Sequence, residues 1–206
     1  MAEIGSRRRS FDWQDTLRQL PKNEHQHGVL GSEICDNLKM QNLESKRLRF
    51  RPFAAADLAE FWSLDTDPEV VRYLGGKIKT QEQCRERLEL IAGHHREHGH
   101  GLCFTQLKTT GEFVGRTGLI PWELDGEKLW EVGYTFARKY WGQGLASEAS
   151  AFWISHGFAG LPVEFLVSLI HPENAASIRV AEKNGMQLWK QTEIKGLRIN
   201  AYRINR

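Results

Sequence analysis

Two glycines precede a predicted helix in the stretch KYWGQGLASEA, residues 139–149. Glycine weakens a helix by roughly 1 kcal/mol relative to alanine, so Gly142 and Gly144 indicate a backbone that needs freedom or close approach by another group. The first turn of a helix presents N–H groups without internal partners and partial positive charge, which suits a phosphate or another anion. A tight turn between a strand and a helix would explain the same glycines. No Gly-Lys-Ser/Thr follows, and Ser147 takes the third glycine position of GxGxxG, so a Walker-type triphosphatase and a dinucleotide dehydrogenase are both disfavoured.

A carboxylate interrupts the otherwise apolar segment LWEVGYTF, residues 129–136. In a strand this residue, Glu131, shares a face with Gly133 and Thr135. Partial burial would raise its pKa toward the range of a useful general base. The alternative is a polar side chain that faces solvent or pairs with a neighbour.

Four histidines fall within HHREHGH, and His94 and His98 have the i, i+4 spacing of a metal-binding pair on a helix. The sequence assigns no third ligand to them, and cations are favoured at a helix C-terminus, which is predicted at this point. We therefore expect no metal. We also interpret the large aromatic residues as core or pocket wall rather than as a platform for stacking bases. These residues are Trp122, Trp130 and Trp153.

The composition narrows the class of protein. The chain has 206 residues, a formal net charge of +2, 40% hydrophobic and 26% charged residues, and no apolar run near the roughly 20 residues of a membrane span. A soluble protein without the strongly basic surface of a nucleic-acid binder is expected. Cys35, Cys84 and Cys103 form no CxxC pair and favour a reducing compartment. No export signal is visible, so the expected location is cytoplasmic.

The sequence divides into an extension and one domain. Residues 1–44 are polar and lack sustained periodicity apart from a short possible helix over residues 11–20, so we expect a flexible N-terminal extension. Met40 is an alternative translation start, and residues 1–39 need not belong to the native protein. Residues 45–206 are expected to form a single domain.

Hydrophobic periodicity predicts the order of elements in this domain. We expect a strand from residue 47, helices over 57–64 and 80–98, and strands over 102–108, 112–120 and 129–136 with a turn at Asp125-Gly126. The glycine-led helix follows, ended by Gly157, Gly160 and Pro162. A buried strand over 163–170, a helix over 175–184 and a hairpin of 186–194 with 197–204 complete the chain. This order predicts an α/β (α+β) fold with helices on both sides of a mixed sheet.

The segment GYTFARKYWGQGLASEA, followed by HPENAASIRVAEKNGM, resembles the GNAT superfamily of N-acetyltransferases and its RimJ/RimL-like branch of N-terminal acetyltransferases of ribosomal proteins. The resemblance covers about Leu43 to Arg206 and includes LESKRLRFRPF and DPEVVRYL. It implies a mostly antiparallel central sheet with a splay between the two central strands, 130–136 and 163–170. It also implies acetyl-CoA as co-substrate and no metal.

The resemblance also assigns cofactor contacts. Trp141 stands where the general acyl-CoA loop, Gln/Arg-x-x-Gly-x-Gly/Ala, has glutamine or arginine, and this removes one polar contact. Main-chain N–H groups of the loop are implied to bind the CoA pyrophosphate, with Gly144 leaving room for the phosphates. These residues are Gly142, Gln143, Gly144, Leu145, Ala146 and Ser147.

The remaining implied contacts lie on the splayed strand and the last helix. The backbone of Tyr134, Thr135 and Phe136 is implied to pair with the pantetheine arm. Asn174 matches the family asparagine near the thiol, although a helix N-cap explains it equally well. The family tyrosine that protonates the thiolate is replaced by Ala181. Ser177, one turn earlier, is the candidate donor, with a capping partner as the alternative.

The expected reaction is direct transfer of acetyl from acetyl-CoA to a primary amine. A peptide α-amine has a pKa of about 7.7 to 8.0 and lysine about 10.4, so deprotonation at pH 7 costs about 1 kcal/mol for the first and roughly 4 to 5 for the second. The N-terminal α-amine of a protein or peptide is therefore the leading acceptor. A polyamine, an aminoglycoside or an amino-acid analogue is the close alternative, and a non-catalytic acyl-CoA-binding module is the distant one. The sequence allows a monomer or a homodimer.

Overall fold

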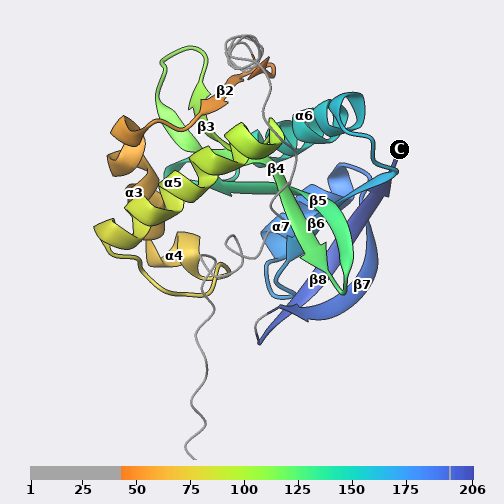
Figure 1. Ribbon diagram of the computed structural model, residues 1–206. Coiled ribbons are helices and arrows are strands. Elements are labelled where there is room, and N and C mark those ends of the chain that lie inside the picture. The colour runs from red at the N-terminus through yellow and green to blue at the C-terminus, as the bar shows by residue number, and fades with distance from the viewer. Residues whose placement is uncertain (1–42, 195) are drawn as a thin grey trace, which may run out of the picture.

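The computed structural model describes residues 43–194 and 196–206, which contain one mixed sheet in the strand order β1-β2-β3-β4-β5-β6-β8-β7 (Figure 1). Neighbouring strands are antiparallel except β5 and β6, which are parallel. The strands are β1 (Leu43–Glu44), β2 (Leu48–Pro52), β3 (Leu102–Leu107), β4 (Phe113–Leu124), β5 (Glu127–Phe136), β6 (Phe165–Ile170), β7 (Gln187–Ile194) and β8 (Leu197–Asn205). The expected mixed, mostly antiparallel sheet is confirmed.

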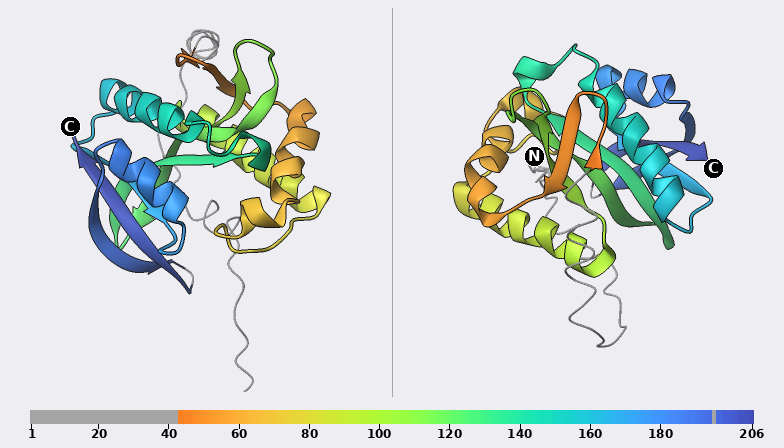
Figure 2. Two further views of the ribbon diagram at one scale, coloured as in Figure 1. Left: turned by 180° about the vertical axis from the view of Figure 1, so that it is seen from behind. Right: turned by 90° about the horizontal axis from the view of Figure 1, so that it is seen from above.

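Helices cover both faces of this sheet (Figure 2). Helices α3 (Leu58–Asp65), α4 (Pro68–Val71) and α5 (Gln81–His98) lie on one side, and α6 (Leu145–Gly160) and α7 (Ala175–Lys183) lie on the other. Short 3-10 turns, η1 (Ala55–Asp57) and η2 (Arg138–Tyr140), precede α3 and α6. Each side has its own core. Phe61, Cys84 and Ile91 pack under α3 and α5, while Leu145, Ala149 and Trp153 pack under α6.

Local signals in the sequence define several boundaries. Thr80 forms a capping box with Gln83 at the start of α5, and Gly99 ends that helix in the left-handed conformation. Asp125 and Gly126 form the two-residue turn between β4 and β5, both with positive φ, as hairpins of this length require. The expected hairpin of the last two strands is also present, with Ile194 opposite Leu197.

Three expected boundaries were wrong. The β4–β5 strands reach to the turn itself, because Trp122 and Leu124 are buried and continue the ladder instead of forming a loop. Helix α6 passes through Gly157, where a Cβ atom would lie 3.0 Å from Leu166 Cδ1 and 3.2 Å from Leu119 Cδ1. Gly157 therefore allows close packing of α6 on the sheet and does not end the helix. Strand β6 begins at Phe165 rather than at residue 163.

The splay between the central strands is present. The parallel strands β5 and β6 share one register pair, Glu131 with Val167, and Ser168 Oγ donates to the carbonyl of Val132 at 2.9 Å beside it. Beyond this point no strand of residues 43–194 and 196–206 pairs with the β6-facing edge of β5. The result is a V-shaped opening between the strand ends.

The histidine cluster lies at the C-terminal end of α5, packed against Trp130. The rings of His94 and His98 have centroids 6.1 Å apart, and His100 contacts both Trp130 and His156. Burial lowers the pKa of His94 and of His100 to about 4, with smaller contributions from neighbouring histidines. Within the described residues no group of three His, Cys, Asp or Glu side chains is placed to hold a metal ion. The neutral rings of His94 and His100 act as packing groups.

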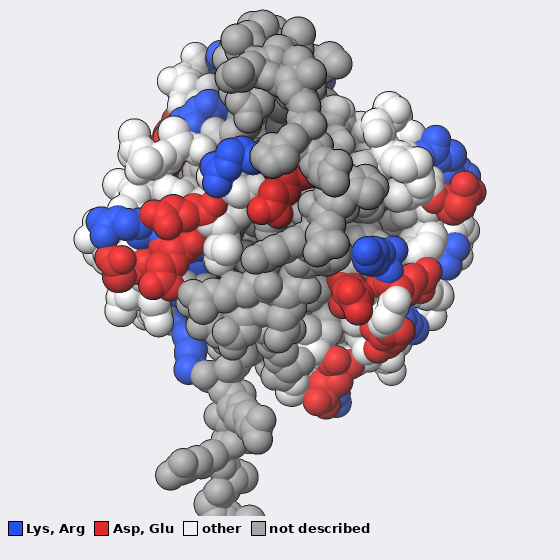
Figure 3. Space-filling view, in the orientation of Figure 1, with Lys and Arg blue, Asp and Glu red and all other residues white. Residues whose placement is uncertain are grey.

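The exposed surface carries charges of both signs. On the face seen in Figure 3, Lys and Arg side chains lie among Asp and Glu side chains wherever the described residues are visible. None of the described helices is long and apolar enough to cross a membrane. Cys84 and Cys103 are buried free thiols. Residues 43–44, the end of the expected extension, form β1 and pair with β2. The expectations for the rest of the extension, for Met40 and for Cys35 fall outside the residues that the structure describes.

Candidate functional site

Two connected cavities occupy the opening between β5 and β6. One, of about 430 Å³, follows the start of α6 and the side of α7, and we call it the loop cavity. The other, of about 100 Å³, reaches Glu131 and is the Glu131 cavity. Six residues line both cavities and so mark their junction. They are Tyr73, Leu74, Tyr134, Thr135, Asn174 and Ser177.

The glycine-led loop has a backbone that only glycine adopts readily. Gly142 and Gly144 have φ values of 74° and 75°, and Gly144 is the N-cap of α6. The first backbone hydrogen bond of the helix runs from Glu148 N to Gly144 O. The N–H groups of Leu145, Ala146 and Ser147 therefore have no acceptor within the helix. Most of the loop lines the loop cavity, namely Trp141, Gly142, Gly144, Leu145, Ala146 and Ser147. Gln143 does not line it; its side chain donates to the carbonyl of Lys139 at 3.0 Å.

Arg47 and Glu148 hold this loop against the first strands. The carboxylate of Glu148 accepts from Ser45 Oγ, Arg47 N and Arg47 Nε, each at 2.6 Å. Arg47 Nη1 also donates to the carbonyl of Gln143 at 3.0 Å. Burial alone would raise the pKa of Glu148, but these hydrogen bonds outweigh burial and lower it. Glu148 thus lies in the first turn of α6, where it complements the helix dipole, and it also anchors the loop.

Trp141 stands where the family motif has a polar residue, and its indole makes a hydrogen bond within the protein. Its Nε1 donates to the carbonyl of Phe136 at 2.7 Å, and the side chain is 48% exposed. Phe136 lines the loop cavity as expected, but one lone pair of its carbonyl is already occupied. Tyr134 leaves more of its backbone for a ligand. Thr135 does not, because it is the ladder partner of Arg116 on β4 and its carbonyl oxygen lies against Gly115 of that strand.

The start of α7 brings three polar groups together at the junction. Asn174 Oδ1 accepts from Ser177 N at 3.1 Å, which makes Asn174 the N-cap of the helix. The hydroxyl of Tyr134 donates to the carbonyl of Ser177 at 3.3 Å. Ala181 is 1% exposed in the core and lines neither cavity. The sequence treated Tyr134 only as a backbone contact, yet its side chain lines both cavities and its hydroxyl contacts the start of α7.

Two cations of α7 line the loop cavity and were missed from the sequence. Arg179 and Lys183 lie one and two turns along the helix from the cap residue, opposite the start of α6. In the sequence they look like ordinary exposed helix residues. Their position beside free amides makes the loop cavity suitable for an anionic ligand.

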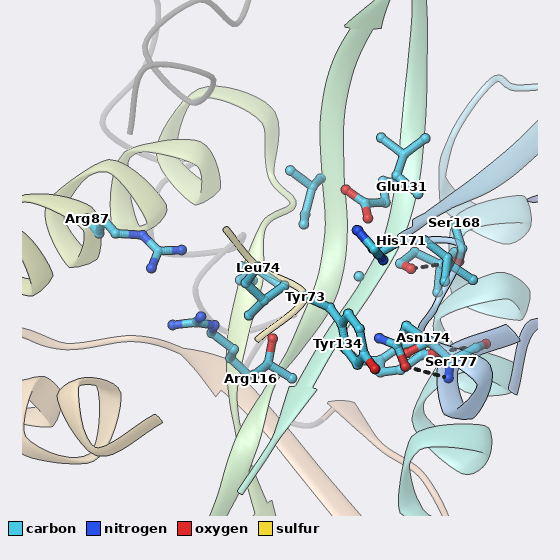
Figure 4. A pocket seen from close by; sticks show the side chains of 17 residues that line it. Tyr73, Leu74, Arg87, Arg116, Glu131, Tyr134, Ser168, His171, Asn174 and Ser177 are labelled. Carbon is cyan, nitrogen blue, oxygen red and sulfur yellow. Dashed lines mark hydrogen bonds between the residues drawn. The ribbon is translucent and has the colours of Figure 1, made fainter. Parts of the chain in front are cut away.

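Glu131 lies at the vertex of the splay and is 5% exposed (Figure 4). Its carboxylate accepts from the indole Nε1 of Trp122. Burial raises the pKa of Glu131 to about 7, and hydrogen bonds from Trp122 and the Leu169 backbone only partly oppose this. Gly133 keeps the neighbouring space free, because a Cβ atom there would lie 2.7 Å from Ile120 Cδ1 and 3.9 Å from Glu131 Cδ.

Two arginines line the Glu131 cavity on the side away from Asn174 and Ser177 (Figure 4). Arg87 of α5 and Arg116 of β4 both pair with the buried Asp65, at 2.5 and 2.8 Å. His171 also lines this cavity, and its Nδ1 accepts from Glu173 N at 3.2 Å. None of these residues was a sequence candidate, because the pattern around each is that of a plain helix, strand or loop.

The arrangement can bind an extended anionic ligand and deprotonate a second molecule. Free amides and two cations flank the loop cavity, an unpaired strand edge leads inward, and a carboxylate with a pKa of about 7 lies at the inner end. Such a layout brings two substrates together at the junction of the cavities.

Comparison with known proteins agrees with this layout. The family model for the acetyltransferase (GNAT) domain matches residues 47–187. The chain is 38% identical over 149 residues to the uncharacterized protein YkkB of Bacillus subtilis (strain 168), covering 72% of this chain and 86% of YkkB. It is 30% identical over 172 residues to the uncharacterized N-acetyltransferase p20 of Bacillus licheniformis, covering 79% and 94%.

Solved structures share the fold. A GNAT-family acetyltransferase from Bacillus anthracis has a TM-score of 0.67 and 25% identity, covering 79% of this chain and 97% of its own. At 17% identity, the ribosomal alpha-N-protein acetyltransferase RimL in complex with coenzyme A has a TM-score of 0.66, covering 78% and 95%. Also at 17%, an aminoglycoside acetyltransferase in complex with coenzyme A has a TM-score of 0.64, covering 77% and 95%.

The family model spans the glycine-led loop, both splayed strands and α7, which are the elements that form the two cavities. The chain therefore belongs to the GNAT acetyltransferases and is an acetyl-CoA-dependent N-acetyltransferase.

Proposed function

We propose that this enzyme transfers acetyl directly from acetyl-CoA to the N-terminal α-amine of a protein or peptide. The observation that carries the proposal is Glu131, a buried carboxylate at the vertex of the splay with a pKa of about 7. Proton transfer to it is uphill by about 1 pKa unit from an α-amine but by more than 3 units from lysine, or roughly 1 against 5 kcal/mol. An α-amine thus suits this base far better.

Acetyl-CoA would lie in the loop cavity with its pyrophosphate at the start of α6 and its thioester toward Glu131. The amides of Leu145, Ala146 and Ser147 would receive the pyrophosphate, with Arg179 and Lys183 supplying positive charge. The pantetheine arm would then extend along the unpaired edge of β5 toward Asn174, adding to the sheet like a strand. This places the thioester at the junction of the cavities, within reach of an amine held beside Glu131.

The protons balance without a strong acid. Glu131 takes one proton from the ammonium group, and the neutral nitrogen attacks the thioester carbon to form a tetrahedral intermediate. When the C–S bond breaks, the nitrogen gives up a second proton and the thiolate takes one up. Burial raises the pKa of Tyr134 to about 12, so its phenol stays neutral. Its one O–H, which donates to the carbonyl of Ser177 in the free enzyme, would turn from that carbonyl to donate a hydrogen bond to the sulfur. A net proton transfer from Tyr134 to a thiolate of ordinary pKa, about 8.5, would be uphill.

Two structural neighbours act on different classes of amine. RimL is named as an alpha-N-protein acetyltransferase, which agrees with the leading proposal. The aminoglycoside acetyltransferase supports a small-molecule amine as the close alternative. The inner cavity of about 100 Å³ is large enough for a terminal amine and its first atoms but small for a ring system, which favours the peptide. A non-catalytic acyl-CoA-binding module would bind acetyl-CoA and release no thiol.

The acceptor is tested by acetyl-CoA-dependent thiol release with two sets of peptides. One set has a free N-terminus, and the other has the same sequences with a blocked N-terminus and a free lysine. We expect release with the first set alone, because only its amine has a pKa near that of Glu131. Release with the blocked set would contradict the proposal, and release with small amines alone would establish the alternative acceptor.

Gly144→Glu is expected to abolish binding of acetyl-CoA, because the new side chain places bulk and negative charge against the pyrophosphate and strains a residue with φ of 75°. Isothermal titration gives the affinity. Gly111→Glu is the matched control, since Gly111 has φ of 72° in a turn and lines neither cavity. Unchanged affinity in a folded Gly144→Glu enzyme would remove the loop from the cofactor site.

Glu131→Gln is expected to lower kcat/KM for a peptide amine by about 100-fold or more at pH 7, with unchanged affinity for acetyl-CoA. Wild-type kcat/KM should rise through about pH 7 as Glu131 ionises, and the variant should lose this rise. The exposed Glu127 on the same strand provides the control Glu127→Gln. A loss below threefold, or an unchanged pH profile in Glu131→Gln, would reject Glu131 as the base.

Tyr134→Phe separates the two candidate donors. We expect it to lower kcat by about tenfold with little change in KM for acetyl-CoA, because only the hydroxyl is removed. Ser177→Ala should lower kcat less than threefold, since Ser177 contacts Tyr134 and Asn174 through its backbone carbonyl and N–H. Steady-state kinetics with both variants decide the matter. A larger loss in Ser177→Ala would assign the donor role to Ser177, as the sequence suggested.

A further inference from the structure

The guanidinium group of Arg116 is only partly used by the protein. Arg116 is 2% exposed, its Nη2 donates to Asp65 Oδ1 at 2.8 Å, and its planar group lies over Phe61, 4.7 Å from the ring centroid. Its Nη1 is buried and has no hydrogen-bond partner among residues 43–194 and 196–206. A buried cationic N–H without an acceptor is destabilising, so an acceptor from a ligand would be strongly favoured there.

Asp65 does not accept from this Nη1. Its Oδ2 accepts from Arg87 Nη1 at 2.5 Å and from Cys84 Sγ at 3.6 Å, and its Oδ1 accepts from Nη2 of Arg116. Burial would raise the pKa of Asp65, but Arg116 and Arg87 outweigh burial and hold it at about 2. The carboxylate is therefore ionised at neutral pH and binds one nitrogen of each guanidinium group.

The position of Arg116 relative to Glu131 suits a second contact with one acceptor molecule. Both residues line the Glu131 cavity, from neighbouring strands and on the same face of the sheet. Ile120, the partner of Glu131 in the ladder, is four residues from Arg116, or about 13 Å along the strand. The thioester is proposed to lie beside Asn174 and Ser177. Figure 4 shows the guanidinium groups of Arg87 and Arg116 on the opposite side of the cavity.

We propose that Arg116 forms an anion subsite in the Glu131 cavity. The acceptor that fits this subsite carries a carboxylate near its amine, supplied by an acidic side chain close to the N-terminus of a peptide. This inference rests on the proposed function, because it assigns a second contact to the same acceptor. Arg116 donates Nη1 to the carboxylate while Glu131 receives the proton from the amine. A polyamine or an aminoglycoside brings only positive charge to this end of the cavity and is repelled.

The test uses two amidated peptides that differ in one group, with the N-terminal sequence Ala-Glu or Ala-Gln. Thiol release by the wild-type enzyme should show kcat/KM at least tenfold higher for Ala-Glu, mainly through KM. In Arg116→Gln this ratio should fall below twofold while the affinity for acetyl-CoA is unchanged. A ratio near one in the wild-type enzyme, or a ratio unchanged in Arg116→Gln, would overturn the subsite.

Arg51→Gln is the matched control. Arg51 also pairs with an aspartate, donating to Asp57 at 2.6 Å, and lies over an aromatic ring, that of Phe104, but lines neither cavity. Both variants lose an arginine–aspartate pair on the same sheet, so a general loss of stability affects both. Only Arg116→Gln should lose the preference for the acidic peptide. An equal loss in Arg51→Gln would count against the subsite.

A binding measurement on the wild-type enzyme tests the subsite even if no peptide is acetylated and even if Arg116→Gln does not fold. The peptide Ala-Glu with an acetylated N-terminus should bind wild-type enzyme at least tenfold more tightly than acetylated Ala-Gln. If no peptide releases thiol but this difference is present, the peptide acceptor is rejected and the anion subsite stands. If free glutamate is acetylated faster than any peptide, the subsite stands and its carboxylate comes from an amino acid. Equal binding of the two blocked peptides overturns the subsite.

Discussion

The single register pair between Glu131 and Val167 is the constraint on which the site depends. A fully paired sheet at this position would satisfy the backbone of β5 on both edges and leave no opening. Because β5 and β6 are parallel and separate after one pair, the edge from Gly133 onward keeps unpaired backbone groups. The two cavities fill that gap, and the residue at its vertex is the carboxylate. The same geometry therefore opens the path proposed for the cofactor and buries Glu131, the proposed base.

The glycine-led loop at the other end of this path carries a negative charge, that of Glu148, which must be compensated. A carboxylate in the first turn of α6 stabilises the helix dipole but repels a phosphate held by the same turn. Arg47 pairs with Glu148 and also holds the carbonyl of Gln143, so it neutralises the carboxylate and fixes the loop in one step. Arg47 is 44% exposed, and a pair of this kind contributes little to global stability. Its importance lies in the position of the loop.

Periodicity and turn chemistry predicted the elements because these signals are local. The Asp125-Gly126 turn and the glycine-led start of α6 could be placed from a few neighbouring residues. Pairs distant in sequence could not: Arg116 meets Asp65 across 51 positions, and Arg47 meets Glu148 across 101. The family motif likewise predicted a vacancy at Ala181 but did not place the hydroxyl of Tyr134 at the start of α7, because that contact joins residues 43 positions apart.

Burial affects two ionisable groups of the site in opposite ways: Glu131 in the Glu131 cavity and Tyr134 at the junction of the two cavities. Desolvation raises the pKa of Glu131 to about 7, where a carboxylate is both basic enough to accept a proton and still substantially ionised. The same effect raises the pKa of Tyr134 to about 12, where a phenol is too weak an acid to lose its proton. One low-dielectric environment thus produces a base from a carboxylate and a neutral hydrogen-bond donor from a phenol. The acidity needed for the leaving thiolate then falls to the attacking nitrogen, which becomes acidic as the new C–N bond forms.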